Sequence, residues 1–138
     1  MELKCFLQDY KIDVALIQET KLTKKSATPA IFGYASVRGD RKGAEFPGGG
    51  LLIYIKDDIP FKSNGHCQRG TTEVLSISVK STLKKWTTIY NIYIPPRGGD
   101  PDLSWLPVSN DTIFAGDLNG HTRIWDDHQP SDARGEKF

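Results

Sequence analysis

The chain has few cysteines, no long apolar run and almost no excess of one charge. Only Cys5 and Cys67 are cysteines among its 138 residues, and they stand far apart without a Cys-x-x-Cys spacing. This pattern argues against a metal site built on thiolates and is typical of a reducing compartment. No apolar segment approaches the roughly 20 residues of a membrane-spanning helix. The N-terminus also lacks the basic and then apolar pattern of a secretory signal.

Eighteen Lys and Arg residues oppose seventeen Asp and Glu residues, for a net charge of +1. A protein that binds nucleic acid through its overall charge usually carries a larger basic excess. Contacts with nucleic acid must therefore come from local clusters, each of which is explained equally well as a solvated surface. The clusters are Lys21 with Lys24 and Lys25, Arg38 with Arg41 and Lys42, and Lys84 with Lys85.

The order of apolar segments predicts a single domain over residues 1–138, a length that suits one domain and not two. Leu3, Phe6 and Leu7 stand at helical spacing and predict a short amphipathic helix near the N-terminus. The continuous apolar run at 14–17 predicts a strand covered on both faces. A helix followed by a buried strand is the usual opening of an α/β layer arrangement.

The remaining apolar segments predict strands at 34–37, 51–55, 73–79, 86–94 and 113–115. Pro60 ends the second of these regions because proline cannot donate a ladder hydrogen bond. Residues 20–33 and 95–111 are polar or rich in Pro and Gly and predict loops. Residues 132–138 look like the first turn of a helix.

Polar residues follow several of these strands at the point where each one ends. They are Glu19, Tyr93, Asp117 and Asn119. Sites are often built at strand ends because the strand is rigid while its terminus faces solvent. A carboxylate there can hold a hard divalent cation. Taken singly, Glu19 is explained better as a strand-ending solvent contact and Asp117 as a turn residue after Gly116.

Three motifs in order resemble the endonuclease/exonuclease/phosphatase superfamily: Gln18-Glu19-Thr20-Lys21, Asn91-Ile92-Tyr93-Ile94-Pro95 and Gly116-Asp117-Leu118-Asn119-Gly120-His121. Within it the chain is similar to the endonuclease domains of non-LTR retrotransposons. Gly48-Gly49-Gly50, His121 followed by Trp125, and Arg134-Gly135-Glu136 favour that branch. The resemblance implies a four-layer α/β sandwich of the deoxyribonuclease I-like type, in which helices flank two packed, largely antiparallel sheets.

The resemblance also implies a role for each matching residue. Glu19 matches a glutamate that binds Mg²⁺ or Mn²⁺, and Tyr93 matches a tyrosine that contacts the scissile phosphate. Asp117 and Asn119 match residues that orient the attacking water and the phosphate. These residue types suit the chemistry, because a cation offsets phosphate charge, a carboxylate can fix a water, and neutral donors stabilise the transition state.

A second set of residues has weaker support. Glu73 matches a glutamate that supports the site in some members, and His121 lies close enough to Asn119 to approach DNA. Because the loops that carry them flank the strand ends, four basic residues are expected to hold DNA phosphates: Lys21, Lys24, Lys25 and Arg97.

The chain departs from the family pattern at both ends. The pattern begins with an asparagine-bearing strand before the first helix and finishes with a Ser-Asp-His motif, which has no credible replacement in His66, His121 or His128. The expectation is therefore an incomplete domain with weak or no activity by itself.

Three functions stay open. The first is Mg²⁺-dependent nicking of target DNA for retrotransposition, in a nuclear parent protein that carries a fused reverse transcriptase and has no membrane association. The second is a phosphatase or apurinic repair endonuclease, which Gly120-His121 and Trp125 disfavour. The third is an inactive fragment that binds nucleic acid or a partner.

Overall fold

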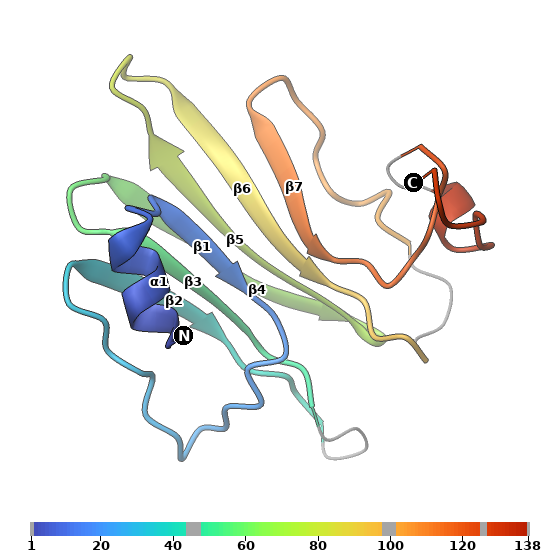
Figure 1. Ribbon diagram of the computed structural model, residues 1–138, viewed down its shortest axis with the longest axis horizontal. Helices are drawn as coiled ribbons and strands as arrows, with labels where there is room; N and C mark the ends of the chain where they lie inside the picture. The colour runs from blue at the N-terminus through green and yellow to red at the C-terminus, as the bar shows by residue number, and fades with distance from the viewer. Residues whose placement is uncertain (1, 44–47, 98–101, 125–126, 138) are drawn as a thin grey trace.

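The computed structural model describes residues 2–43, 48–97, 102–124 and 127–137, and Trp125 lies outside them. The order of elements is α1 (Leu3–Asp9), β1 (Val14–Ile17), β2 (Tyr34–Gly39), β3 (Leu51–Lys56), β4 (Phe61–Arg69), β5 (Thr72–Lys80), β6 (Trp86–Tyr93), β7 (Thr112–Asp117) and a 3-10 turn, η1 (Gly135–Lys137) (Figure 1).

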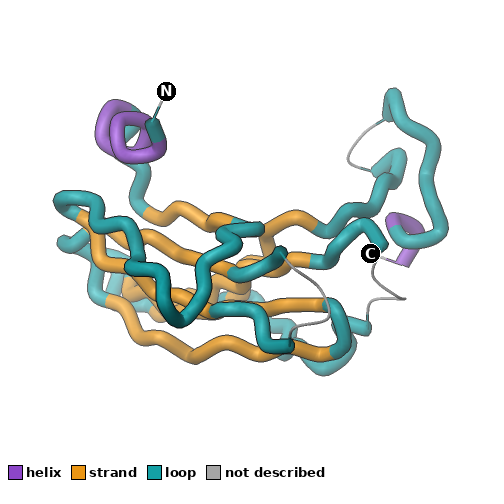
Figure 2. The backbone as a smooth tube through the Cα atoms, turned by 90° about the horizontal axis from the view of Figure 1, so that it is seen from below, coloured by secondary structure: helices purple, strands orange, loops and turns teal. Residues whose placement is uncertain are grey.

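The strands form two sheets that lie against each other. Sheet A has the order β1-β3-β2, and sheet B has the order β4-β5-β6-β7. Every neighbouring pair is antiparallel except β6 and β7, which run parallel. Figure 2 shows the sheets edge-on, with α1 outside the layers of strands. The long connection between β6 and β7 is what a parallel pair requires, since a tight hairpin cannot join parallel strands.

The main core lies between the two sheets. It contains Leu51, Ile53 and Ile55 of β3 together with Leu75 and Ile77 of β5, all of them buried. In β5 these side chains alternate with serines, as the period of a strand requires. Each buried aliphatic side chain of this kind stabilises the fold by about 1.5–3 kcal/mol relative to an exposed one, so this interface holds the two sheets together.

A second cluster joins α1 to the outer face of sheet A. Leu7 of α1 packs with Ile31, Leu52 and Tyr54 there. The predicted N-terminal helix is therefore confirmed. Its apolar stripe is only partly used, because Leu7 is the buried residue of the helix and Phe6 stays 42% exposed.

The expected α/β class is wrong for this chain. The described residues form a mostly-β fold of two sheets with three and four strands, one α-helix of 7 residues and a 3-residue 3-10 turn. Apart from the short α1, no helix covers a sheet in this part of the chain, because the long connections contain helix breakers such as Pro29, Pro95 and Pro96. The segment at 132–138, expected to begin a helix, forms only η1.

All six predicted strands are present: the strand at 14–17 keeps its bounds, four strands are longer by one to three residues, and the strand at 86–94 is shorter by one. The prediction missed β4, a strand of 9 residues whose side chains are mostly exposed. It lies at the edge of sheet B and pairs with β5 alone. Because backbone hydrogen bonds rather than apolar side chains hold it, its polar sequence carries no periodic signal.

No described helix is long and apolar enough to cross a membrane.

Candidate functional site

The ends of β1, β6 and β7 meet at one corner of the two sheets. The hydroxyl of Tyr93, the last residue of β6, donates a hydrogen bond to Oε1 of Glu19, which lies just beyond β1 and 74 positions away in the sequence. Asp117 is the partner of Tyr93 in the parallel β6–β7 pair. Partners in a ladder share a face of the sheet, so the structure brings Glu19, Tyr93 and Asp117 together.

Asn119 completes this corner through the turn after β7. Its backbone has a φ of 46°, a left-handed conformation that asparagine tolerates better than most residues. The Asn119 amide N–H donates to Oδ1 of Asp117 at 3.1 Å, and its side-chain nitrogen donates to the Ile94 carbonyl at 3.0 Å. These two bonds fix the Asn119 side chain beside Asp117, and both side chains remain partly or fully exposed to solvent.

The loop that carries Glu19 is held by the backbone of the glycine run. Glu19 and Lys21 have positive φ values of 53° and 54°, a strained conformation for residues with side chains. The Thr20 amide donates to the Gly50 carbonyl at 3.1 Å, and the Lys21 amide donates to the Gly49 carbonyl at 2.9 Å. Gly50 has a φ of +87°, and a Cβ there would overlap Oγ1 of Thr20. Gly50 is thus needed for the close approach that positions Glu19.

Replacing Gly50 with alanine should cost more stability than the same change at Gly33. Both residues have positive φ values, +87° and +84°, but a Cβ at Gly33 meets nothing within 4 Å. The strain common to both is about 1–2 kcal/mol, and the clash at Gly50 adds about 1–3 kcal/mol. Urea denaturation of both variants measures the difference, and equal losses would contradict the proposed contact with Thr20.

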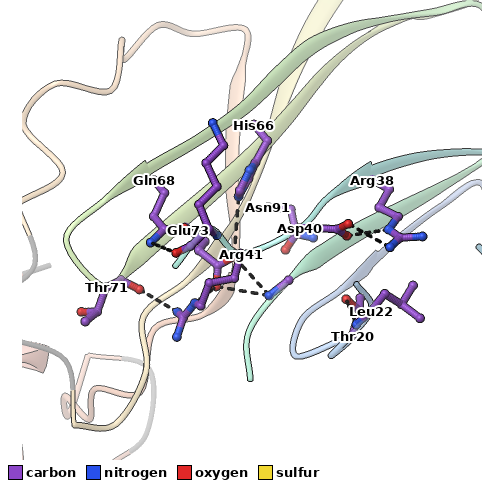
Figure 3. A network of polar contacts seen from close by, with 12 residues as sticks. Thr20, Leu22, Arg38, Asp40, Arg41, His66, Gln68, Thr71, Glu73 and Asn91 are labelled. Atoms are coloured by element: carbon purple, nitrogen blue, oxygen red, sulfur yellow. Dashed lines mark hydrogen bonds and ion pairs between the residues drawn. The ribbon is translucent and has the colours of Figure 1, made fainter. Parts of the chain in front are cut away.

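A buried carboxylate, Glu73, lies at the start of β5 beside Gly49 and Gly50 (Figure 3). It has no exposed surface and accepts hydrogen bonds from the Gly50 amide at 3.1 Å and from Nε of Arg41 at 2.7 Å. Arg41 also donates to the Thr71 carbonyl at 2.9 Å and lies 5.7 Å from the centre of the Tyr93 ring. Glu73 therefore supports the corner through Gly50 and Arg41, and it has no surface with which to touch a substrate.

A second polar connection joins the two sheets below the site. Asn91 of β6 is fully buried and accepts a hydrogen bond from the Gln18 side chain at 2.6 Å. Its amide nitrogen donates to the Ile17 carbonyl at 3.1 Å. These bonds attach the end of β1 to β6 directly before Glu19 and Tyr93. Gln18 and Asn91 both belong to the sequence motifs, but the motifs did not predict that these two side chains are in contact.

The Tyr93 hydroxyl is held in its neutral form. Burial, the hydrogen bond to Glu19 and the charges of Glu19 and Asp117 together raise the pKa of Tyr93 from the ordinary 10.0 to about 12, against an opposing effect of Arg41. A raised pKa in the folded state adds stability that is fully present below pH 10 and is lost as the pH rises toward 12. At neutral pH Tyr93 is therefore a hydrogen-bond donor.

Two clefts open at this end of the molecule. The site cleft, of about 410 Å³, is lined by Glu19, Tyr93, Lys21 and Arg97, among others. A larger cleft of about 840 Å³ is lined by Lys24 and Lys25, and Arg41 borders both. Of the four basic residues expected to contact DNA, Lys21 and Arg97 thus line the site cleft, whereas Lys24 and Lys25 line its neighbour.

His121 does not join the corner. Its side chain is exposed. The pKa of Asp132 is lowered, chiefly by the hydrogen bond from the Gly135 amide, and the backbone amides of His121 and Arg134 act in the same direction. Arg134 of the same segment donates to the carbonyls of Pro95 and Asn119, both at 3.1 Å. Arg134 therefore connects the loops that follow β6 and β7. Arg134 and Arg41 both belong to patterns noted in the sequence, but these supporting roles were not predicted from them.

The donor set of the corner fits a hard divalent cation. Glu19 and Asp117 supply carboxylate oxygens, and the Glu19 carboxylate is 45% exposed, with Nζ of Lys21 at 3.8 Å from Oε2. Mg²⁺ is commonly held by one or two carboxylates together with waters and substrate phosphates. The described residues contain no group of three His, Cys, Asp or Glu side chains that could enclose a metal.

Comparison with known proteins adds no further assignment. No family model matches the chain, and no curated protein matches it.

Proposed function

We propose that this chain is a metal-dependent phosphodiesterase domain that acts on DNA, as members of the endonuclease/exonuclease/phosphatase superfamily do. The observation that supports the proposal is the convergence of Glu19, Tyr93, Asp117 and Asn119 from three strand ends at one corner. Glu19 and Tyr93 line the open site cleft at this corner. Structural packing does not require four polar side chains at such a place, whereas phosphate chemistry uses each of these types.

Each side chain has a task in this proposal. A divalent cation at Glu19 would offset charge on the phosphate oxygens. Asp117, exposed and close to Tyr93, fixes the attacking water and accepts its proton. The neutral Tyr93 hydroxyl and the Asn119 amide donate hydrogen bonds to phosphate oxygens. Since Tyr93 donates to Glu19 in this structure, phosphate binding requires that its hydroxyl turn from Glu19 toward the ligand.

A second candidate function is DNA binding without hydrolysis. Two observations favour it: Lys21 is paired with Glu19, and the described residues provide no three-ligand metal cluster. In this case Lys21 holds a phosphate and offsets the Glu19 charge in place of a cation.

Nicking of supercoiled plasmid tests the choice between them. The chain is incubated with plasmid in Mg²⁺, in Mn²⁺ and in chelator, beside a Glu19→Gln variant purified in the same way. Because the chain lacks the Ser-Asp-His motif of the family pattern, we expect weak nicking that requires the cation, and nicking by Glu19→Gln no faster than that seen in chelator. A folded chain that binds plasmid and leaves it intact in both metals would establish the second candidate instead.

A further inference from the structure

The larger cleft, hereafter the basic groove, collects positive charge on a chain that is nearly neutral overall. Its lining includes five Lys and Arg residues and one carboxylate: Lys24, Lys25, Arg38, Arg41 and Lys42, with Asp40. The whole chain has a net charge of +1. Such an uneven distribution is the usual sign of a surface that binds a polyanion.

The arginines of the basic groove are used to build its walls. Arg38 forms an ion pair with Asp40 and donates to the Ser26 carbonyl at 2.7 Å and to Oγ1 of Thr28 at 3.2 Å. It also donates to the Thr23 carbonyl. Arg38 therefore holds the loop of Lys24 and Lys25 against β2. Because its donors are already engaged, its contribution is to shape the groove.

The opposite wall is held in the same way. The Gln68 side chain of β4 accepts from the Lys42 amide at 2.9 Å and donates to the Lys42 carbonyl at 3.2 Å. Arg41, beside it, is paired with buried Glu73. The His66 ring also lines the groove, and its Nε2 is buried without a hydrogen-bond partner, 3.6 Å from Glu73.

The three lysines of the basic groove, Lys24, Lys25 and Lys42, differ from its arginines. Their side chains are exposed, and within the described chain none of them forms an ion pair. Their backbones are fixed while their ammonium groups remain available. Lysine serves as a point charge for phosphate rather than as a planar, bidentate partner. The groove is thus suited to the evenly spaced phosphates of a strand and not to one tightly held anion.

We propose that the basic groove binds the phosphates of a DNA strand next to the phosphate in the site cleft, with Arg41 at the junction of the two clefts. The path of the DNA strand in this inference rests on the proposed function. The DNA strand passes from Tyr93 over Arg41 and then between Lys24, Lys25 and Lys42. Lys24, Lys25 and Lys42 set position and affinity and carry no base specificity.

Binding in chelator tests the groove separately from hydrolysis. Fluorescence anisotropy of a short labelled DNA duplex is measured over a range of salt concentrations for the unchanged chain and for Lys24→Glu/Lys25→Glu. Loss of two phosphate contacts should weaken binding on the order of tenfold or more and reduce the slope of log K against log salt by about 2. Lys42→Glu should act in the same direction with a slope change of about 1.

The matched control is Lys62→Glu/Lys80→Glu, which makes the same change in charge outside the groove, where both side chains lie over the Trp86 ring. We expect this control to bind DNA almost as the unchanged chain does at physiological salt, because screening limits charge effects to about 8 Å. Equal losses of DNA affinity in both double variants would overturn the proposal that the basic groove binds DNA, since they would show that affinity depends on overall charge alone. An equal loss of affinity for poly-glutamate would assign the groove to acidic peptides and also overturn the proposal.

The two proposals fail in different ways. A chain that never nicks plasmid but shows the selective loss in Lys24→Glu/Lys25→Glu refutes hydrolysis and retains the groove as a DNA site. A chain that nicks plasmid with no selective loss refutes the groove alone. Duplexes shortened from either side of a nicked position then test the direction of the DNA strand across the two clefts. Shortening on the side that lies in the basic groove should weaken binding by the unchanged chain. The same shortening should have little effect on binding by Lys24→Glu/Lys25→Glu.

Discussion

Replacing Glu73 with alanine should lower the free energy of unfolding by about 3–5 kcal/mol, the usual cost of removing one partner from a buried ion pair. Glu73 is fully buried, and the Arg41 side chain is only 10% exposed. The change would leave the Arg41 guanidinium without its carboxylate and the Gly50 amide without its acceptor. It would also open a cavity, since alanine cannot fill the space of the glutamate. Urea denaturation followed by tryptophan fluorescence measures the loss.

Two further variants show whether charge or volume causes this effect. Glu73→Gln keeps the shape and a carbonyl acceptor, so we expect a smaller loss than with alanine. Glu136→Ala removes an exposed glutamate near the C-terminus, and we expect a change within about 0.5 kcal/mol. A loss below about 1 kcal/mol in Glu73→Ala would mean that water enters and replaces the carboxylate, which would contradict the tight network described here.

Replacing Asp117 with alanine should reduce the rate of plasmid nicking by about 10²–10⁴-fold, the range for removal of a general base. The prediction depends on the proposed function. Asp117 is exposed, and its carboxylate accepts a hydrogen bond from the Asn119 amide at 3.1 Å. Stability should therefore change by less than about 1 kcal/mol, and the loss should appear in the rate and not in the amount of folded protein.

Asp111→Ala is the matched control for Asp117→Ala. Asp111 directly precedes β7, at the end opposite Asp117, and is paired with Lys85 on the surface. It has the same side chain in a similarly accessible place, yet it is remote from the site cleft. We expect nicking by Asp111→Ala at the unchanged rate. If both variants nicked plasmid equally well, Asp117 would have no part in the chemistry.

The apolar strands could be predicted from the sequence because their side chains report burial directly. β3 is the clearest example, since its continuous apolar run requires cover on both faces and is almost entirely buried. β4 could not be predicted, because its place depends on the free edge of β5 and not on its own side chains. The class of the fold was predicted wrongly for a related reason: a family resemblance implied flanking helices that the Pro-containing connections of this chain do not form.

The candidate site could be predicted only in part. Polar residues at strand ends indicated Glu19, Tyr93, Asp117 and Asn119, and the structure brings these four together. Their supports were not visible in the same way. Arg41 lies in a loop of mixed charge, and its role depends on a buried carboxylate from a strand of the other sheet. Such a pairing follows from the packing of the sheets and leaves no local pattern in the sequence.

The hydrogen bonds that define the corner span 73 and 74 positions of the chain, from Gln18 to Asn91 and from Glu19 to Tyr93. Closing loops of this length costs entropy before any contact compensates for it, so folds dominated by such contacts form slowly. Helix α1 and the hairpin of β4 and β5 can form from neighbouring residues early. The corner can form only when β1 and β6 have both joined their sheets and the sheets have met. During synthesis and refolding, the corner and the phosphate binding proposed for it would therefore arise last, and their recovery would report complete assembly of the protein.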